Sequence, residues 1–144
     1  MEFDIAISRA LNSIVGISYW SDLLLFFIAD YLEYFLILGV FAYWLLERKS
    51  NKNAHRNLLL FVFSVVLSRG MITEIIRYFW YRERPFFTIP DLWIVVPQLA
   101  LPSFPSGHAA MYFAIAFVMY HLNKRIGSWY FVFAALISLS RVVL

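Results

Sequence analysis

Long apolar runs separated by short polar stretches dominate this chain. The first run extends from Trp20 to Leu46 and the second from about Asn57 to Trp80. As helices, both are long enough to cross the roughly 30 Å hydrocarbon layer of a membrane. A third run, from Pro105 to His121, is short for a crossing, and a fourth begins near Gly127 and continues to the last residue. The pattern predicts an all-α, polytopic bundle of four transmembrane helices.

Residues 1–18 show a different pattern, with apolar residues on one helical face and polar residues on the other. The apolar face consists of Phe3, Ile7, Ala10, Ile14 and Ile17. This spacing predicts an N-terminal amphipathic helix in the membrane interface, and an ordinary packed helix of the bundle is the alternative. Glu2 and Asp4 replace the basic start of a secretory signal, and no apolar run of the proper length follows.

The composition points to a protein covered by lipid. Of the 144 residues, 62% are hydrophobic and 15% are charged, whereas a soluble domain is about half apolar and a quarter charged. A core this small cannot hide so many large side chains. The absence of cysteine excludes disulfides and Cys-ligated metal sites. We therefore interpret residues 1–144 as a single membrane domain. Nucleic-acid binding is not expected, because the basic residues lie in short loops beside the spans.

The positions of these basic residues predict the orientation. Residues 47–56 and 123–126 form two turns that hold six of the twelve lysines and arginines. Short loops rich in lysine and arginine beside membrane spans usually remain in the cytoplasm, so we expect both turns there. The ends of the second and fourth spans and the start of the third would then lie on the other side. The expected localisation is the cell membrane, with several crossings and a site that faces the extracytoplasmic side.

Four ionisable residues interrupt the first two spans: Asp30, Glu33, Arg69 and Glu74. An unpaired charge in hydrocarbon costs a few kcal/mol even on lenient scales. Antiparallel packing of the two spans would bring Arg69 to the depth of the first two carboxylates. We predict that Arg69 forms a salt bridge with one of the three acids. A purely structural pair and a role in shaping the site are both open.

Candidate chemistry lies at the end of the second span and the start of the third. Arg77 and Arg84 offer forked donors that match phosphate oxygens. Ser106 and Gly107 form a small-residue turn that opens a helix and presents free N–H groups to an anion. His108, beside the turn, can donate a proton near neutral pH. Taken singly, these features fit interfacial arginines and an ordinary loop, but together they indicate a site for a phosphate ester.

The spacing of these residues resembles a known family. Arg77, six residues, Arg84-Pro85 and then Pro105-Ser106-Gly107-His108 resemble the first two signatures of the type 2 phosphatidic acid phosphatase superfamily, which includes lipid phosphatases and vanadium haloperoxidases. The third signature is Ser-Arg, five residues, His, three residues, Asp, and it resembles the chain at Ser140-Arg141. By this spacing the family's nucleophilic histidine falls three residues after Leu144. The domain is therefore expected to be incomplete at its C-terminus, and this chain to be nearly inactive.

The resemblance also implies the roles of individual residues. The implied phosphate-binding residues are Arg77, Arg84, Ser106, Gly107 and Arg141. His108 matches the residue that protonates the leaving oxygen, while the histidine of the third signature forms a phosphohistidine. The family often has lysine at the position of Arg77, which differs in geometry from arginine. No metal or other cofactor is implied, and we interpret His55 and His121 as structural.

The expected function is therefore that of a membrane lipid-phosphate phosphatase. The short chain and its amphipathic leader resemble bacterial undecaprenyl-diphosphate phosphatases, which implies roles in cell wall biogenesis and bacitracin resistance. Phosphatidylglycerophosphate and phosphatidate are alternative substrates. A catalytically inactive membrane scaffold or transporter is the alternative of another class. The expected partners are a lipid phosphate or diphosphate and the membrane, and the sequence leaves the oligomeric state open.

Overall fold

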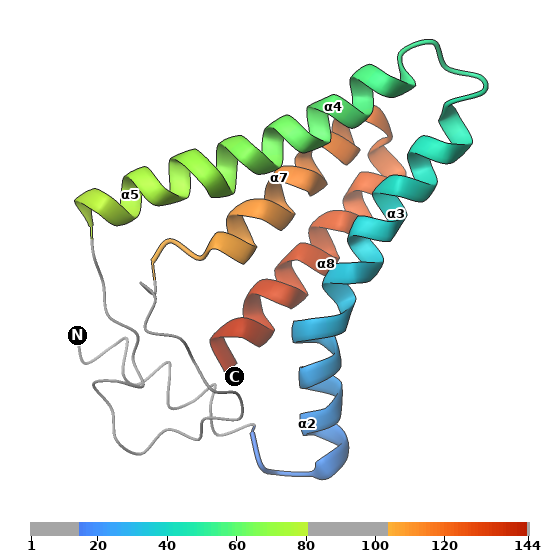
Figure 1. Cartoon of the computed structure of the whole chain (residues 1–144). Helices are drawn as coiled ribbons and strands as arrows, with labels where there is room; N and C mark the ends of the chain where they lie inside the picture. Colours follow the sequence, from blue (N-terminus) through green and yellow to red (C-terminus); the bar gives the residue numbers. More distant parts are fainter. Residues whose placement is uncertain (1–14, 81–103, 144) are drawn as a thin grey trace.

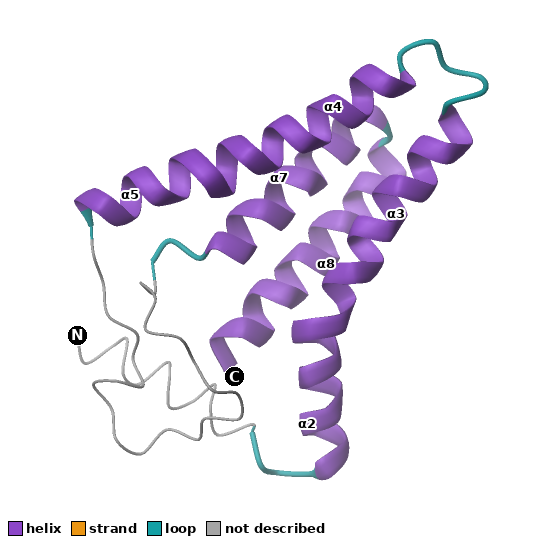
Figure 2. Cartoon of the chain, viewed as in Figure 1, coloured by secondary structure: helices purple, strands orange, loops and turns teal. Residues whose placement is uncertain are grey.

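The computed structural model describes residues 15–80 and 104–143 (Figure 1). All regular elements in these two ranges are helices, and no described residue lies in a strand (Figure 2), which confirms the all-α prediction. Most of the predicted N-terminal amphipathic helix, and also Arg84, lie outside the described residues. The prediction is wrong for residues 15–18, which form a turn. Gly16 has a φ of 83° there, and its N–H donates to Asp22 Oδ1 at 2.9 Å, so the chain reverses before the first span.

Two long helices make up the first part of the bundle, and each contains a π-helical segment. The first consists of α2 (Tyr19–Phe26), η1 (Phe27–Tyr31) and α3 (Leu32–Glu47). The second consists of α4 (Ala54–Val65), η2 (Val66–Ile72) and α5 (Thr73–Phe79). Figure 1 shows the first helix bending between α2 and α3, at the π-helical segment. Such segments commonly bend a helix and change which residues face its neighbours.

The remaining two helices form a hairpin, α7 (Gly107–Leu122) and α8 (Lys124–Val143). Asn123 alone separates them, and its side chain accepts a hydrogen bond from the N–H of Ile126 at 3.1 Å. Gly127 is buried directly against the backbone of Tyr120, where a Cβ would overlap main-chain atoms. The hairpin can close this tightly only because glycine occupies this position.

The core lies where α7 and α8 meet the two long helices. Its buried side chains are Leu36, Val40, Phe61, Tyr112, Ile115, Ala116, Met119, Tyr130, Ala134 and Ile137. Ala116 and Ala134 are fully buried, and small residues of this kind let helix backbones approach closely in membranes. The hydroxyl of Tyr130 donates to the Leu36 carbonyl at 3.1 Å, which connects α8 to α3 inside this core.

The outer surface of the bundle is strongly apolar. Leu46 and Phe117, for example, are 79% and 68% exposed. Two described helical stretches, Tyr19–Glu47 and Ala54–Phe79, are long and apolar enough to cross a membrane. α7 is apolar but has only 16 residues. The structure thus supports the first two predicted spans and leaves the other two as predictions.

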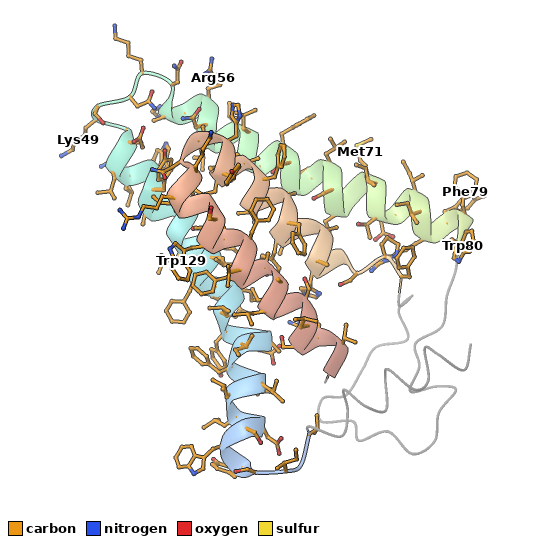
Figure 3. The ribbon with its side chains drawn as sticks, turned by 180° about the vertical axis from the view of Figure 1, so that it is seen from behind. Lys49, Arg56, Met71, Phe79, Trp80 and Trp129 are labelled. Atoms are coloured by element: carbon orange, nitrogen blue, oxygen red, sulfur yellow. The ribbon has the colours of Figure 1, made fainter. Side chains whose placement is uncertain are left out.

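The two basic turns lie together at one end of the bundle. Figures 1 and 3 show the α3–α4 turn, which carries Lys49, at the same end as the α7–α8 junction. Phe79 and Trp80 lie at the opposite end of the second long helix (Figure 3). The two long helices diverge from their turn, and the α7–α8 hairpin lies between them (Figure 1). We call the end away from the two basic turns the open end of the bundle. The divergence of the long helices determines which residues can meet there.

Candidate active site

The start of α7 is built as a capped helix terminus. The Ser106 hydroxyl oxygen accepts a hydrogen bond from the N–H of Ala109 at 3.3 Å, and the Ser106 carbonyl accepts one from Ala110 at 3.0 Å. The first N–H groups of a helix are not hydrogen-bonded within it, because no preceding turn supplies carbonyls for them. Such groups favour an anion. Ser106 therefore acts as the N-cap of α7.

Two arginines from the second long helix flank this turn. Nη2 of Arg77 donates to the Pro105 carbonyl at 3.2 Å, while Nη1 binds Glu74 Oε1 at 2.8 Å. A Cβ built on Gly107 would lie 3.6 Å from Arg77 Nη2 and 3.8 Å from Arg69 Cγ. Sequence reasoning missed Arg69 as a neighbour of the turn. Its spacing of eight residues from Arg77, about two helical turns, was the available signal.

Two carboxylates from the first long helix, Asp30 and Glu33, lie near His108 and Arg141, and we call them the carboxylate cluster. Glu33 Oε2 accepts a hydrogen bond from the Tyr112 hydroxyl at 2.8 Å. The same oxygen is 3.5 Å from Arg141 Nη2 and 3.9 Å from His108 Nε2. Asp30 Oδ1 is 3.1 Å from Arg141 Nη2. Arg141, near the end of α8, is thus paired with the first helix through two carboxylates.

These contacts correct the predicted pairing of Arg69. Among the described residues Arg69 makes no ion pair; Asp30 and Glu33 pair with Arg141 instead, and Glu74 with Arg77. The reason is geometric. η1 packs against α8 and η2 against α7, because the α7–α8 hairpin separates the two long helices at this depth (Figure 1).

Tyr112 contacts both His108 and Glu33. Its ring is stacked on that of His108, with centroids 6.4 Å apart and an interplanar angle of 21°. It is 1% exposed, whereas the His108 side chain is 35% exposed. Tyr112 follows His108 by four residues, which places both on one face of α7. Sequence reasoning missed it because a tyrosine in an apolar helix looks like an ordinary core residue.

Two arginine donors near the start of α7 are buried. Nε of Arg77 and Nε of Arg141 have no hydrogen-bond partner within the part of the chain that the structure describes. Buried polar groups are normally hydrogen-bonded, so each such atom requires an explanation. Both guanidinium groups have further donors that form ion pairs, with Glu74 for Arg77 and with Asp30 and Glu33 for Arg141.

The structure therefore brings five of the predicted site residues to the open end of the bundle: Arg77, Ser106, Gly107, His108 and Arg141. A groove of about 390 Å³ lies beside them on η2 and α5, between Gly70 and Phe79. It includes Glu74, the ion-pair partner of Arg77, but none of the five. His55 contacts the Trp44 ring edge-on, with ring centroids 5.7 Å apart. A structural role for His55 and His121 remains a prediction.

Comparison with known proteins agrees with the sequence motifs. The model of the PAP2 superfamily matches residues 57–144. The chain is 28% identical over 119 residues to the bacitracin transport permease protein BcrC of Bacillus licheniformis, a match that covers 81% of this chain. The chain spans 56% of the length of that relative. No solved structure matches the chain. Since the family match extends over more than half of its residues and includes the arginine and Pro-Ser-Gly-His motifs, the chain belongs to the PAP2 superfamily.

Proposed function

We propose that the chain forms the phosphate-binding and proton-donating part of a membrane phosphatase for lipid phosphates or diphosphates, with undecaprenyl diphosphate as the favoured substrate. One observation carries the proposal. Two arginines, whose buried Nε atoms have no hydrogen-bond partner among the described residues, and a partly exposed histidine gather around a glycine-containing helix start. Family membership supports the phosphatase chemistry. The favoured substrate rests on the resemblance to bacterial undecaprenyl-diphosphate phosphatases and on a relative named for bacitracin transport.

In this proposal the arginines bind the phosphoryl oxygens. Arg77 and Arg141 would donate their Nε protons, which have no acceptor among the described residues. Arg84 would add a third guanidinium, and the first-turn N–H groups of α7 would add weaker donors. Charge on these oxygens changes as the phosphoryl group is transferred. Fixed donors in a site with little water stabilise that charge without reorganising, which is usually the largest contribution to the rate.

His108 would act as the general acid. As the bond between phosphorus and the leaving oxygen breaks, its proton passes to that oxygen, and the phosphoryl group passes to a histidine nitrogen. Water then attacks the phosphohistidine, and His108 accepts a proton from the water. The attacking histidine corresponds to the third signature, whose expected position follows Leu144. This scheme uses no metal.

The test is phosphate release from undecaprenyl diphosphate with EDTA present. We expect steady turnover from a chain that continues through the third signature, and weak orthovanadate binding with almost no turnover from residues 1–144. In the longer chain His108→Ala should lower the rate by about 10²–10⁴-fold. His121→Ala, near the opposite end of the same helix, is the matched control and should leave the rate unchanged.

Three results would count against parts of the proposal. Robust turnover by residues 1–144 would show that the nucleophile lies within them. Higher specificity for phosphatidylglycerophosphate or phosphatidate would replace the favoured substrate while keeping the phosphatase. Inactivity of the longer chain toward all of these lipids would favour the membrane scaffold or transporter.

A further inference from the structure

The first long helix contributes to the site although the family match begins only at residue 57. Asp30 lies in η1 and Glu33 in the first turn of α3. Their carboxylates reach Arg141 on α8, and Glu33 also reaches Tyr112 and His108 on α7. Segments far apart in the sequence therefore meet at a single pair of carboxylates.

Glu33 is the residue that connects these groups. One of its oxygens, Oε2, contacts a hydroxyl, a guanidinium and an imidazole, and its side chain is only 15% exposed. A carboxylate so placed in an apolar bundle is unfavourable unless it is paired. The contacts with Tyr112 and Arg141 therefore restrict its position. The direct consequence is that a negative charge is held beside His108 Nε2.

The backbone of the first helix explains how both acids reach one arginine. Asp30 and Glu33 are three residues apart and flank the end of η1, where the helix changes from π to α. η1 packs against α8, which carries Arg141. Single π-helical segments inside α-helices occur frequently at functional sites. The second long helix also has one, η2, which carries Arg69 to the other side of the α7 start.

We propose that Glu33 is a positioning residue of the reaction, which orients His108 and Arg141. The inference rests on the proposed function of the site. Arg141 pairs with the Glu33 carboxylate, while Arg69 and Arg77 lie beside Gly107 at the start of α7. The carboxylate lies 3.9 Å from Nε2 of His108 and 3.5 Å from Nη2 of Arg141, so one side chain can hold both groups in place. Tyr112 fixes this carboxylate through its hydroxyl and supports the imidazole with its ring.

A comparison of leaving groups separates this role from a purely structural one. A long-chain alkyl phosphate has a poor leaving group and requires the acid, whereas p-nitrophenyl phosphate has a good one and does not. Glu33→Gln removes the charge but keeps the size and an oxygen for Tyr112. In the chain that continues through the third signature, we expect this variant to slow the alkyl substrate about tenfold or more and p-nitrophenyl phosphate less than about threefold.

Further variants keep the test decisive. Tyr112→Phe retains the ring and the Glu33 charge but loses the hydroxyl, so it should show the same selective loss to a smaller degree. If Glu33→Gln does not fold, the Tyr112→Phe variant tests the positioning role of Glu33 in its place. Adding Glu33→Gln to His108→Ala should cause a further loss on the alkyl substrate of less than about threefold, because His108 is no longer there to be oriented and only the Arg141 contact is lost. Glu47→Gln, at the other end of α3, is the matched control and should behave like the unsubstituted protein.

The possible outcomes are distinct. Equal losses on both substrates, or a faster reaction, would overturn the positioning role while leaving the phosphatase intact. Tighter orthovanadate binding by Glu33→Gln without a selective loss would also overturn it, because Glu33 would then compete with phosphate for Arg141. If the unsubstituted protein hydrolyses neither substrate, the proposed function fails, and this inference fails with it.

Discussion

Gly107 occupies the point at which the start of α7 meets the arginines. A Cβ at this position would lie 3.6 Å from Arg77 Nη2, an ordinary van der Waals distance, so the fold has room for a methyl group. The methyl group would nevertheless cover the first-turn N–H groups and restrict an anion's approach to the guanidinium. If the proposed function is correct, the glycine serves anion binding and the fold does not require it.

We therefore predict that Gly107→Ala folds normally but binds orthovanadate about tenfold more weakly, a difference of about 1.4 kcal/mol. Its thermal stability should be unchanged or slightly higher, because alanine is a better helix former by up to about 1 kcal/mol. Titration of detergent-purified protein with orthovanadate measures the affinity. Gly70→Ala, where a Cβ has nothing within 4 Å, is the matched control. Equal affinity of the two variants would contradict a role of the helix start in binding.

The residues of the carboxylate cluster show where sequence reasoning was sufficient and where it was not. The ionisable character of Asp30, Glu33 and Arg69 inside apolar runs was visible from the sequence, as was the need for pairing. The choice of partner was not visible. Asp30 and Glu33 pair with Arg141, more than a hundred residues away, because α8 and not η2 packs against η1. No local pattern contains that information.

Among the elements, the α7–α8 hairpin depends most on a single glycine. Gly127 lies against the Tyr120 backbone with no space for a side chain. A methyl group there must push the two helices apart, and the fully buried Ala116 and Ala134 would lose contacts as a result. Because α7 carries His108 and α8 carries Arg141, this spacing also determines the geometry of the site.

We predict that Gly127→Ala lowers the free energy of unfolding by about 3 kcal/mol, at the upper end of typical overpacking costs. Unfolding in mixed detergent micelles, followed by tryptophan fluorescence, measures this change. Ser128→Ala removes only an exposed hydroxyl that donates to the Lys124 carbonyl, and it should stay within about 0.5 kcal/mol of the parent. If Gly127→Ala is as stable as this control, α7 and α8 do not pack as closely as described.

At the scale of the whole molecule, the basic turns and the site lie at opposite ends of the bundle (Figures 1 and 3). The arrangement agrees with the orientation predicted from lysine and arginine, in which both turns remain in the cytoplasm. A site for lipid phosphate would then open toward the outer leaflet. The exposed apolar side chains of the long helices provide the surface that lipid covers.

Cysteine labelling tests this orientation, and the chain provides a clean background because it has no cysteine. We expect Lys52→Cys to react with a membrane-impermeant maleimide only after the cells are opened. Trp80→Cys, which lies at the other end of the second long helix and is 70% exposed in the parent, should react in intact cells. The reverse pattern would place the site on the cytoplasmic side.

The sequence by itself determined the all-helical class, the two long apolar helices and the family, because hydrophobic period, turn residues and short motifs are local properties. The tertiary structure alone decided how the charged residues are matched. The diverging long helices and the inserted α7–α8 hairpin bring Glu33 to His108 and Arg141, and place Arg69 beside Gly107. Partners of buried charges depend on which helices touch at a given depth, and that is a property of packing and not of any segment.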